Sequence, residues 1–347
     1  MREALASSTL PPSMERPIEN ITLVKLGAIG DAVNTLPLVN RLRDGFPKAR
    51  IQWVIGPPAH SLIGGHAAVD DFLVLDSKRL AAWPAAVREL RASKPDLVID
   101  LQRILKSGLL TRLSGAPRRL GFDRARCKEA AWLFTNERIA PNATPGVTVS
   151  QYLEFADHLG LAQSEPRWDL PCTPWSETGD ASAPLVVLNL GASKEANHWY
   201  AEAWAQLADA LVNEFSARVV LSGGPQDRAA ADAVQQLASQ ALEDRVGTLS
   251  LKQSAGLFEV ADLFIGGDTG PLHMAVAVGT PVVALFGAAD PRRTGPFGMP
   301  HSVVTHPTDC QPCRKRHCFV AGHPCMRLLT AEAVMQRVRE NLAPVAR

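Results

Sequence analysis

Short apolar runs alternate with amphipathic stretches along most of the chain. Near the N-terminus, NITLVKLG predicts a strand, DAVNTLPLVNRLRDGFP a helix and ARIQWVIG a second strand. The pattern continues with the predicted strands DDFLVLD and PDLVIDLQ and the predicted helices AAWPAAVRELRAS and ILKSGLLTRLSG. Strands that alternate with helices are typical of a parallel sheet that carries helices on both faces.

A second alternation follows PRWDLPCTPWSETGDASAP, a stretch rich in Pro, Ser and Thr that predicts a linker. Two such sets of similar size imply an α/β protein with two doubly wound, Rossmann-like domains. Ligands of such sheets bind beyond the carboxyl ends of the strands, here in the cleft between the domains. The predicted segments are a disordered tail (1–17), a first domain (18–172), a linker (173–182), a second domain (183–330) and a C-terminal helix (331–347).

The composition narrows the class of protein. A chain of 347 residues exceeds what one hydrophobic core usually serves, and 46% hydrophobic with 20% charged residues is typical of a soluble globular protein. The net charge of +1 provides no global field that would attract nucleic acid. No apolar run approaches the roughly 20 residues of a membrane span, and the N-terminal stretch lacks the apolar core of a signal peptide. We therefore expect a cytoplasmic protein.

The first strand-end loop, KLGAIGD, places Gly27, Gly30 and Asp31 where a strand enters a helix. Asp31 has two interpretations, because aspartate is among the best helix N-caps and a carboxylate here can also act as a general base. The glycine spacing differs from G-x-G-x-x-G, and no acidic residue ends the second strand. A dinucleotide-dependent dehydrogenase is therefore a poor fit.

A late loop, GGDTGPLHMAVAVG, combines an acid, a hydroxyl, a glycine and a histidine at the start of a helix. Pro271 favours a helix start, whose free N–H groups and dipole attract phosphate. Asp268 and Thr269 can hydrogen-bond a sugar or phosphate, and His273 lies in the first helical turn. The alternative is a capped helix packed through small residues, with a purely structural histidine.

Two further strand-end loops belong to the second domain. LNLGASKEANHW offers Gly191, Ser193 and Lys194, whose ammonium can reach a phosphate. LSGGPQD offers Gln226 and Asp227 for a base or a ribose. With the loop at Asp268, these residues predict a nucleotide site on the second domain.

A basic run lies in the first domain. It can be a solvated face, or it can bind an anionic acceptor and an anionic membrane surface. The run holds eight basic residues against Asp123: Arg103, Lys106, Arg112, Arg118, Arg119, Arg124, Arg126 and Lys128.

Four of the six cysteines, Cys310, Cys313, Cys318 and Cys325, form a C-x2-C-x4-C-x6-C cluster. Such spacing in a reducing compartment suits a tetrahedral thiolate site, which predicts a structural zinc or iron ion. Free thiols or a single disulfide are the alternatives.

These motifs together resemble glycosyltransferase family 9, the bacterial heptosyltransferases. The resemblance rests on ITLVKLGAIGDAVNTLPLVNRLRDGFPKARIQWVI, VIDLQRILKSGLLTRLSGAPRRLGFDR, NLGASKEANHW and GGDTGPLHMAVAVGTPVVALFGAADPRRTGP, in order from Ile21 to the C-terminus. It implies a glycosyltransferase B fold, with the acceptor on the first domain and the nucleotide sugar on the second. It also implies inverting transfer of heptose from ADP-heptose to the inner core of lipopolysaccharide, with no cofactor required.

The same resemblance assigns roles to residues. Asp31 matches the family's proposed base, and Lys106 matches a basic residue near the acceptor. The predicted donor-binding residues are Gly191, Ser193, Lys194, Gln226, Asp268, Thr269, Gly270 and His273. The predicted acceptor-binding residues are Gly30, Asn34, Arg103 and Lys106.

Three positions depart from the family pattern. Many members have a serine pair at Gly27–Ala28, a histidine at Asn34 and a lysine at Asn197, for which Lys194 can substitute. These departures leave open a different sugar, a protein acceptor such as an autotransporter, or a catalytically silent nucleotide-binding protein. The protein acceptor is kept because family members that glycosylate autotransporters carry a cysteine-bound iron. A nucleotide-sugar epimerase on the same fold is a further alternative.

Overall fold

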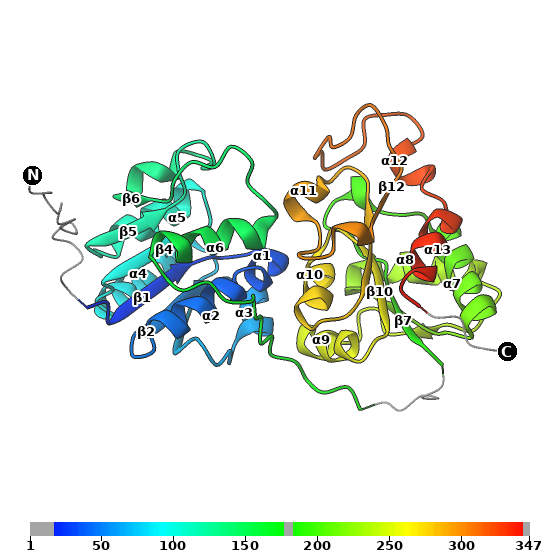
Figure 1. Ribbon diagram of the computed structural model, residues 1–347, viewed down its shortest axis with the longest axis horizontal. Helices are drawn as coiled ribbons and strands as arrows, with labels where there is room; N and C mark the ends of the chain where they lie inside the picture. Colours follow the sequence, from blue (N-terminus) through cyan, green and yellow to red (C-terminus); the bar gives the residue numbers. More distant parts are fainter. Residues whose placement is uncertain (1–16, 177–182, 343–347) are drawn as a thin grey trace, which may run out of the picture.

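Two parallel six-stranded sheets form the framework of the protein (Figure 1). The structure is a computed structural model that describes residues 17–176 and 183–342. Most of the predicted tail (1–17), part of the predicted linker (173–182) and the end of the predicted C-terminal segment (331–347) lie outside the described residues. The predicted domain boundaries stay predictions, although Thr173 N already donates to the Lys252 carbonyl at 2.9 Å.

The first sheet has the strand order β3-β2-β1-β4-β5-β6. Its strands are β1 (Asn20–Val24), β2 (Arg50–Ile55), β3 (Asp71–Val74), β4 (Leu97–Asp100), β5 (Arg118–Gly121) and β6 (Glu137–Arg138). Its helices are α1 (Ile29–Val33), α2 (Leu36–Gly45), α3 (Pro57–Ile63), α4 (Trp83–Ala92), α5 (Leu105–Leu113) and α6 (Thr148–His158). The first domain also contains the 3₁₀ helices η2 (Leu80–Ala82) and η3 (Ala131–Phe134).

The second sheet has the order β12-β11-β10-β7-β8-β9. Its strands are β7 (Leu185–Asn189), β8 (Arg218–Ser222), β9 (Glu243–Asp244), β10 (Leu263–Gly267), β11 (Val282–Phe286) and β12 (Val303–Thr305). Its helices are α7 (Ala201–Phe215), α8 (Arg228–Leu237), α9 (Leu251–Glu259), α10 (Gly270–Ala277), α11 (Pro291–Thr294), α12 (Pro324–Arg327) and α13 (Ala331–Arg339).

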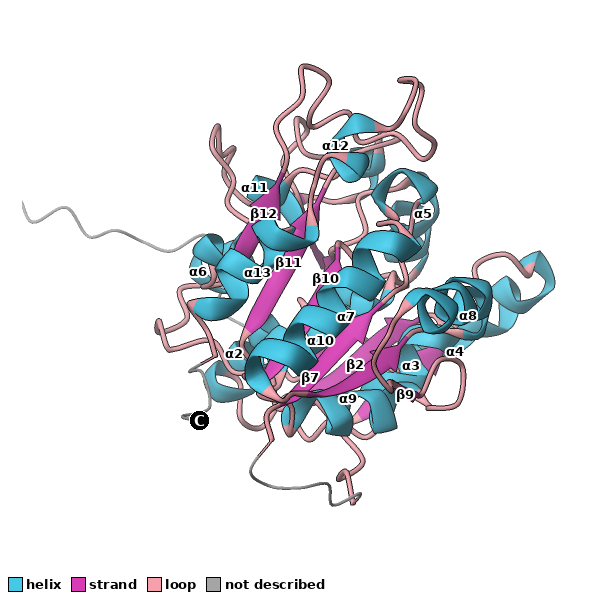
Figure 2. Cartoon of the chain, turned by 90° about the vertical axis from the view of Figure 1, so that its right-hand side faces the viewer, coloured by secondary structure: helices cyan, strands magenta, loops and turns pink. Residues whose placement is uncertain are grey.

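Helices cover both faces of each sheet, so every residue of strands such as β10 and β11 is buried. One core cluster contains α1, α2, α3 and α6 of the first domain together with α9 and α10 of the second. These helices therefore lie between the two sheets. The outer faces carry α4 and α5 on the first sheet, and α7, α8 and α13 on the second. Figure 2 shows α7 and α13 lying over the strands of the second sheet.

The two domains meet where α1 approaches α10. A Cβ atom on Gly30 would lie 2.6 Å from Cδ2 of His273 and 3.3 Å from Cα of Gly270. Only glycine at these positions permits so close an approach. Two hydrogen bonds also join the domains: Lys252 Nζ donates to the Gly64 carbonyl at 2.7 Å, and Thr148 Oγ1 donates to the Arg293 carbonyl at 3.1 Å.

The structure corrects some predicted elements. The helix predicted over DAVNTLPLVNRLRDGFP is two helices, α1 and α2, separated at Asn34 and Thr35. Pro37 explains the break, because its nitrogen has no hydrogen to donate to a carbonyl of the preceding turn. Helix α3 lies in GPPAHSLI, a sequence not predicted as helical, and begins with Pro57 and Pro58. Strands β6 and β9 are two residues long, which is too short for a sequence pattern.

Candidate active site

The carboxylate of Asp31 is paired with a buried lysine. Lys25 directly follows β1, and its Nζ donates to Asp31 Oδ2 at 3.0 Å. The Lys25 side chain is buried, whereas that of Asp31 is 38% exposed. Lys25 Nζ also lies 5.6 Å from the ring centroid of the buried Tyr152. The pair therefore places a carboxylate, open on one side, near the end of the first strand.

This pairing controls the charge of Asp31. Burial alone would raise the pKa of Asp31, but Lys25, and to a smaller extent His273 and Arg103, hold it below its usual value. Burial would likewise lower the pKa of Lys25, but Tyr152 and Asp31 raise it. Asp31 is thus ionised near neutral pH, as a proton acceptor must be.

The helix-cap interpretation of Asp31 is wrong. Helix α1 has Ala28 at its N-cap, and Asp31 is the third helical residue. Its side chain makes no capping hydrogen bond and pairs with Lys25 instead. Asp31 is therefore the counter-charge of Lys25 and not a helix cap.

His273 faces Asp31 across the domain interface. The imidazole is buried beside Gly30, and burial lowers its pKa despite the opposing influence of Asp268 and Asp31. A neutral imidazole can donate a hydrogen bond without adding a buried charge. The arrangement joins the carboxylate of the first domain to the start of α10 in the second.

The start of α10 collects polar groups from several loops. Thr269 is the N-cap and Gly270 the first helical residue, as the sequence predicted for a helix start. Ser193 Oγ donates to the Asp268 carbonyl at 3.4 Å. Burial raises the pKa of Asp268, and His273, Thr294, Arg293 and Lys194 act against that rise. The loops after β7 and β10 thus meet at one place.

Lys194 and Asn197 have different positions in the loop after β7. Lys194 Nζ donates to the Arg314 carbonyl at 3.2 Å, and its charge acts on Asp268. Asn197 is buried, and its Oδ1 accepts from Ala289 N at 3.2 Å. Lys194 is therefore the cation of this loop that lies near Asp268, whereas Asn197 ties the loop to the segment after β11.

Gln226 belongs to a separate contact in the same domain. Its Nε2 donates to Asp227 Oδ2 at 3.1 Å, and Asp227 also accepts from Gly224 N at 2.8 Å. A Cβ atom on Gly191 would lie 2.6 Å from Asp227 Oδ2, so the loops after β7 and β8 touch at this glycine. The structure thus places Gly191 and Gln226 around the Asp227 carboxylate.

On the acceptor side, Arg103 is the residue the structure places near Asp31. Its guanidinium lies 3.8 Å from the Phe122 ring centroid and donates to Gln151 Oε1 at 3.0 Å. Asn34 is buried at the end of α1. Lys106 is exposed on α5, and its Nζ donates to the Ser77 carbonyl at 3.4 Å. The described contacts therefore do not bring Lys106 to Asp31.

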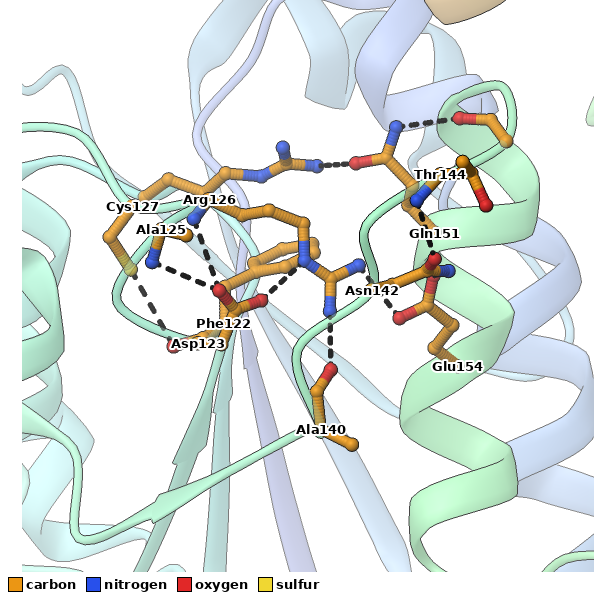
Figure 3. A network of polar contacts seen from close by, with 12 residues as sticks. Phe122, Asp123, Ala125, Arg126, Cys127, Ala140, Asn142, Thr144, Gln151 and Glu154 are labelled. Carbon is orange, nitrogen blue, oxygen red and sulfur yellow. Dashed lines mark hydrogen bonds and ion pairs between the residues drawn. The ribbon is translucent and has the colours of Figure 1, made fainter.

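The basic run is two sets of residues rather than one surface. Figure 3 shows Arg126 bound to Asp123 and to Glu154, whose Oε2 is 2.7 Å from Arg126 Nη1. Arg118 pairs with Glu137 at 2.8 Å. These two arginines stabilise the fold, whereas Lys106, Arg112, Arg124 and Lys128 are exposed.

Sequence reasoning missed three residues at the ends of β1 and β4 and on α6: Lys25, Asp100 and Tyr152. Asp100 is buried, accepting from Gln102 N at 2.9 Å and from Ser107 Oγ at 3.0 Å. Burial raises the pKa of Asp100 to about 6. Lys25 and Asp100 each end a buried strand with a charge, and that pattern could have revealed them.

The cysteine cluster lies close to the donor loops. Gln311 Nε2 donates to the Gly287 carbonyl at 2.8 Å, and Ala196 N donates to the Arg316 carbonyl at 3.0 Å. Burial, and to a smaller extent the thiols of Cys318, Cys310 and Cys313, raise the pKa of Cys325 to about 11. Within residues 17–176 and 183–342, however, no three His, Cys, Asp or Glu side chains are arranged to hold one metal ion. The predicted metal site is not preformed.

Two facing Rossmann-like domains, with a carboxylate on one and an anion-attracting helix start on the other, define a glycosyltransferase of the B fold. The model of glycosyltransferase family 9 (heptosyltransferase) matches residues 83–323. The chain belongs to this family.

Known proteins agree with this assignment over nearly the whole chain. The lipopolysaccharide core heptosyltransferase OpsX of Haemophilus influenzae is 24% identical over 306 residues, which cover 85% of this chain and 86% of OpsX. Escherichia coli heptosyltransferase WaaC with ADP superposes with a TM-score of 0.74 at 25% identity, covering 93% of this chain and 100% of that one. A family 9 glycosyl transferase of Veillonella parvula has a TM-score of 0.79 at 20% identity, covering 94% and 98%.

Proposed function

We propose that this protein transfers heptose from ADP-heptose to the inner core of lipopolysaccharide. The observation that carries the proposal is the position of Asp31, held ionised by Lys25 and facing His273 at the start of α10. OpsX is a lipopolysaccharide core heptosyltransferase, which supports the proposed acceptor. WaaC is a heptosyltransferase whose structure contains ADP, which supports the proposed donor. The proposal places the enzyme in the cytoplasm, in peripheral contact with the inner membrane.

The proposed reaction is a single displacement. Asp31 takes the proton of the acceptor hydroxyl while the hydroxyl oxygen attacks the anomeric carbon of heptose. The bond from that carbon to the β-phosphate oxygen breaks on the opposite side, and its electron pair leaves with ADP. The configuration at the anomeric carbon therefore inverts.

The second domain would bind the diphosphate of the donor before and during its departure. The N–H groups at the start of α10 and the Lys194 ammonium supply positive potential there, and neutral His273 supplies a hydrogen-bond donor. The remaining proposed donor residues are Gly191, Ser193, Gln226, Asp268, Thr269 and Gly270. Gly30, Asn34, Arg103 and Lys106 remain the proposed acceptor residues, although Lys106 would need to turn from the Ser77 carbonyl.

A transfer assay tests this function. Purified protein is incubated with ADP-heptose and an inner-core acceptor that ends in Kdo or in heptose, and the product is analysed by mass spectrometry. We expect the acceptor to gain one heptose residue with inverted configuration. Turnover on a protein acceptor alone, release of free heptose alone, a 2-epimer of the donor, or binding of ADP-heptose without turnover would each contradict the proposal and identify its replacement.

We also propose that the cysteine cluster holds a structural zinc or iron ion once its loop adjusts. The C-x2-C-x4-C-x6-C spacing supplies four thiols within one segment, and thiolates are preferred ligands of both metals. Elemental analysis of protein purified without chelator should find one metal ion per chain. Cys313→Ser should lose it, and Cys127→Ser, outside the cluster, should retain it. Four titratable thiols in the folded protein, with no metal above background, would contradict this proposal.

A further inference from the structure

Four exposed leucines lie on the outer face of the first domain. Leu105 and Leu109 are on α5, Leu133 is on η3, and Leu80 is on η2. Their exposed fractions run from 41% to 73%. Exposed leucines scattered singly need no explanation, but a gathering of them marks an interaction site. These four residues are called the leucine surface below.

The elements that carry the leucine surface are neighbours in space. Helix α5 packs so closely on η3 that a Cβ atom on Gly108 would lie 2.7 Å from the Phe134 ring and 3.1 Å from the Ala131 carbonyl. The bond from Lys106 Nζ to the Ser77 carbonyl ties the start of α5 to the segment that leads into η2. Helix α4, which follows η2, contacts α5 on the same outer face of the sheet (Figure 1).

Exposed cations lie close in sequence to the four leucines. Lys78, Arg79, Arg112, Arg124 and Lys128 are exposed, and in the described part of the chain none of them pairs with a carboxylate. Glu129, which follows Lys128, accepts from Leu105 N at 3.2 Å and so caps α5, and Asp76 accepts from Lys78 N at 3.0 Å. The guanidinium carbons of Arg124 and Arg138 lie 4.8 and 5.7 Å from the ring of Trp132.

Leucine, tryptophan and unpaired arginine and lysine on one face are what the interface of an anionic bilayer attracts. Apolar side chains enter the boundary of headgroups and acyl chains, and cations stay with the anionic headgroups. A second copy of the same face would bring like charges together, so self-association is disfavoured. Among the helices that the structure describes, none is long and apolar enough to cross a bilayer.

We propose that the leucine surface is the site at which the protein docks on a bilayer with anionic headgroups. The leucine surface lies near the acceptor side of the site, because α5 starts just beyond Asp100 and Arg103. An acceptor anchored in the bilayer would reach Asp31 without leaving the membrane surface. Only this last step rests on the proposed function.

Vesicle co-sedimentation tests the proposal. Wild-type protein is mixed with phosphatidylcholine vesicles that contain either no phosphatidylglycerol or about a third of it. We expect binding to the anionic vesicles only, weakened by salt. Leu80→Ser combined with Leu133→Ser should weaken it about tenfold or more, and so should Arg79→Gln combined with Arg112→Gln, because each cation and each apolar side chain contributes separately.

Matched controls distinguish docking at the leucine surface from nonspecific adsorption through exposed apolar residues. Leu237→Ser combined with Val260→Ser changes two similarly exposed apolar residues of the second domain and should leave vesicle binding unchanged. Absence of binding to anionic vesicles, or equal loss in the control, would overturn the proposal. A lipid-free dimer that dissociates in the Leu80→Ser/Leu133→Ser variant would overturn it too, in favour of self-association.

The proposed function is followed separately in the same variants. Transfer to a deacylated, water-soluble inner-core acceptor should be unchanged in all three double variants, because none alters a proposed site residue. If the wild type fails on this acceptor, the proposed function fails, while vesicle binding still decides the docking proposal.

Discussion

In the candidate site, the carboxylates of the first domain have side-chain partners, whereas Lys194 and Ser193 of the second domain donate to backbone carbonyls. Asp31 is bound by the ammonium of Lys25 at 3.0 Å, and Asp100 by the hydroxyl of Ser107 at 3.0 Å. In the second domain, by contrast, Lys194 Nζ contacts the Arg314 carbonyl and Ser193 Oγ contacts the Asp268 carbonyl.

This difference has a chemical meaning under the proposed reaction. A general base must be ionised and oriented before the substrate arrives, and a buried partner such as Lys25 achieves both. A diphosphate-binding group must instead give up its protein partner when the ligand binds. A neutral carbonyl is a weaker partner than a phosphate oxygen, so giving it up costs little free energy. Substitutions in the first domain should therefore act on kcat, and those in the second on the KM of the donor.

The largest effect is expected from Asp31→Asn. The amide oxygen can still accept from Lys25, so the protein should fold with a lowered melting temperature, since a buried cation loses its counter-charge. The amide cannot take a proton, and kcat should fall by roughly 10²–10⁴-fold. Stopped-time transfer assays measure kcat, and stabilisation of the folded protein by ADP measures donor binding.

Asp76→Asn, at an exposed turn of the same domain, is the control and should keep full activity. If Asp31→Asn retains more than about a tenth of wild-type kcat, the loss is smaller than that expected of a general base. The assignment of Asp31 as the base would then be wrong.

Gly30→Ala is expected to lower kcat about a hundredfold. The new methyl group would lie 2.6 Å from the His273 ring, and the domains would have to move apart. A displacement of about 1 Å between reacting groups costs a rate factor of this order. Alanine is the better helix former by about 1 kcal/mol, so α1 itself should gain stability. Kinetics together with thermal unfolding would separate the two effects, and unchanged turnover would show that the contact is not needed.

The sequence predicted the two-domain α/β architecture and the main strands, because their apolar runs are long and regular. Asp31, Asp268 and His273 could be proposed from the sequence because they lie in the segments that lead from such strands into the next helix. The pair between Lys25 and Asp31 was not, because it joins residues on two elements whose relative position depends on packing. The division of the basic run could not be predicted for the same reason: only contacts distinguish the paired Arg118 and Arg126 from exposed neighbours.

Asp100→Asn should change how stability depends on pH. The folded-state pKa of Asp100, about 6, exceeds the ordinary 3.8, so folding favours the protonated acid. Its stabilising contribution is complete below pH 4 and is lost as pH rises through 6. Asparagine does not titrate. Across this pH range, the free energy of unfolding of the variant should therefore rise relative to that of the wild type by up to about 3 kcal/mol.

Urea unfolding at pH 4, 5, 6 and 7, followed by the fluorescence of buried Trp53, measures this difference in the free energy of unfolding. Asp96→Asn, which removes the same charge from a partly exposed carboxylate that accepts from Asn20 N, provides the comparison. A constant difference between Asp100→Asn and wild type from pH 4 to 7 would mean that Asp100 titrates normally.

Lys194→Ala should have the smallest effect, and it tests the second domain. The ammonium contacts only a carbonyl in the described contacts, so its removal should leave the fold and the melting temperature nearly unchanged. Loss of one charge-assisted contact to the diphosphate should raise the donor KM about tenfold, with a smaller change in kcat. Lys194→Arg should restore most of the affinity, and Lys315→Ala, an exposed lysine of the neighbouring loop, should have no effect. Initial rates over a range of ADP-heptose concentrations measure both constants. If Lys194→Ala lowers kcat as strongly as Asp31→Asn at an unchanged KM, the division of labour between the two domains is wrong, because Lys194 would then act mainly on the transition state.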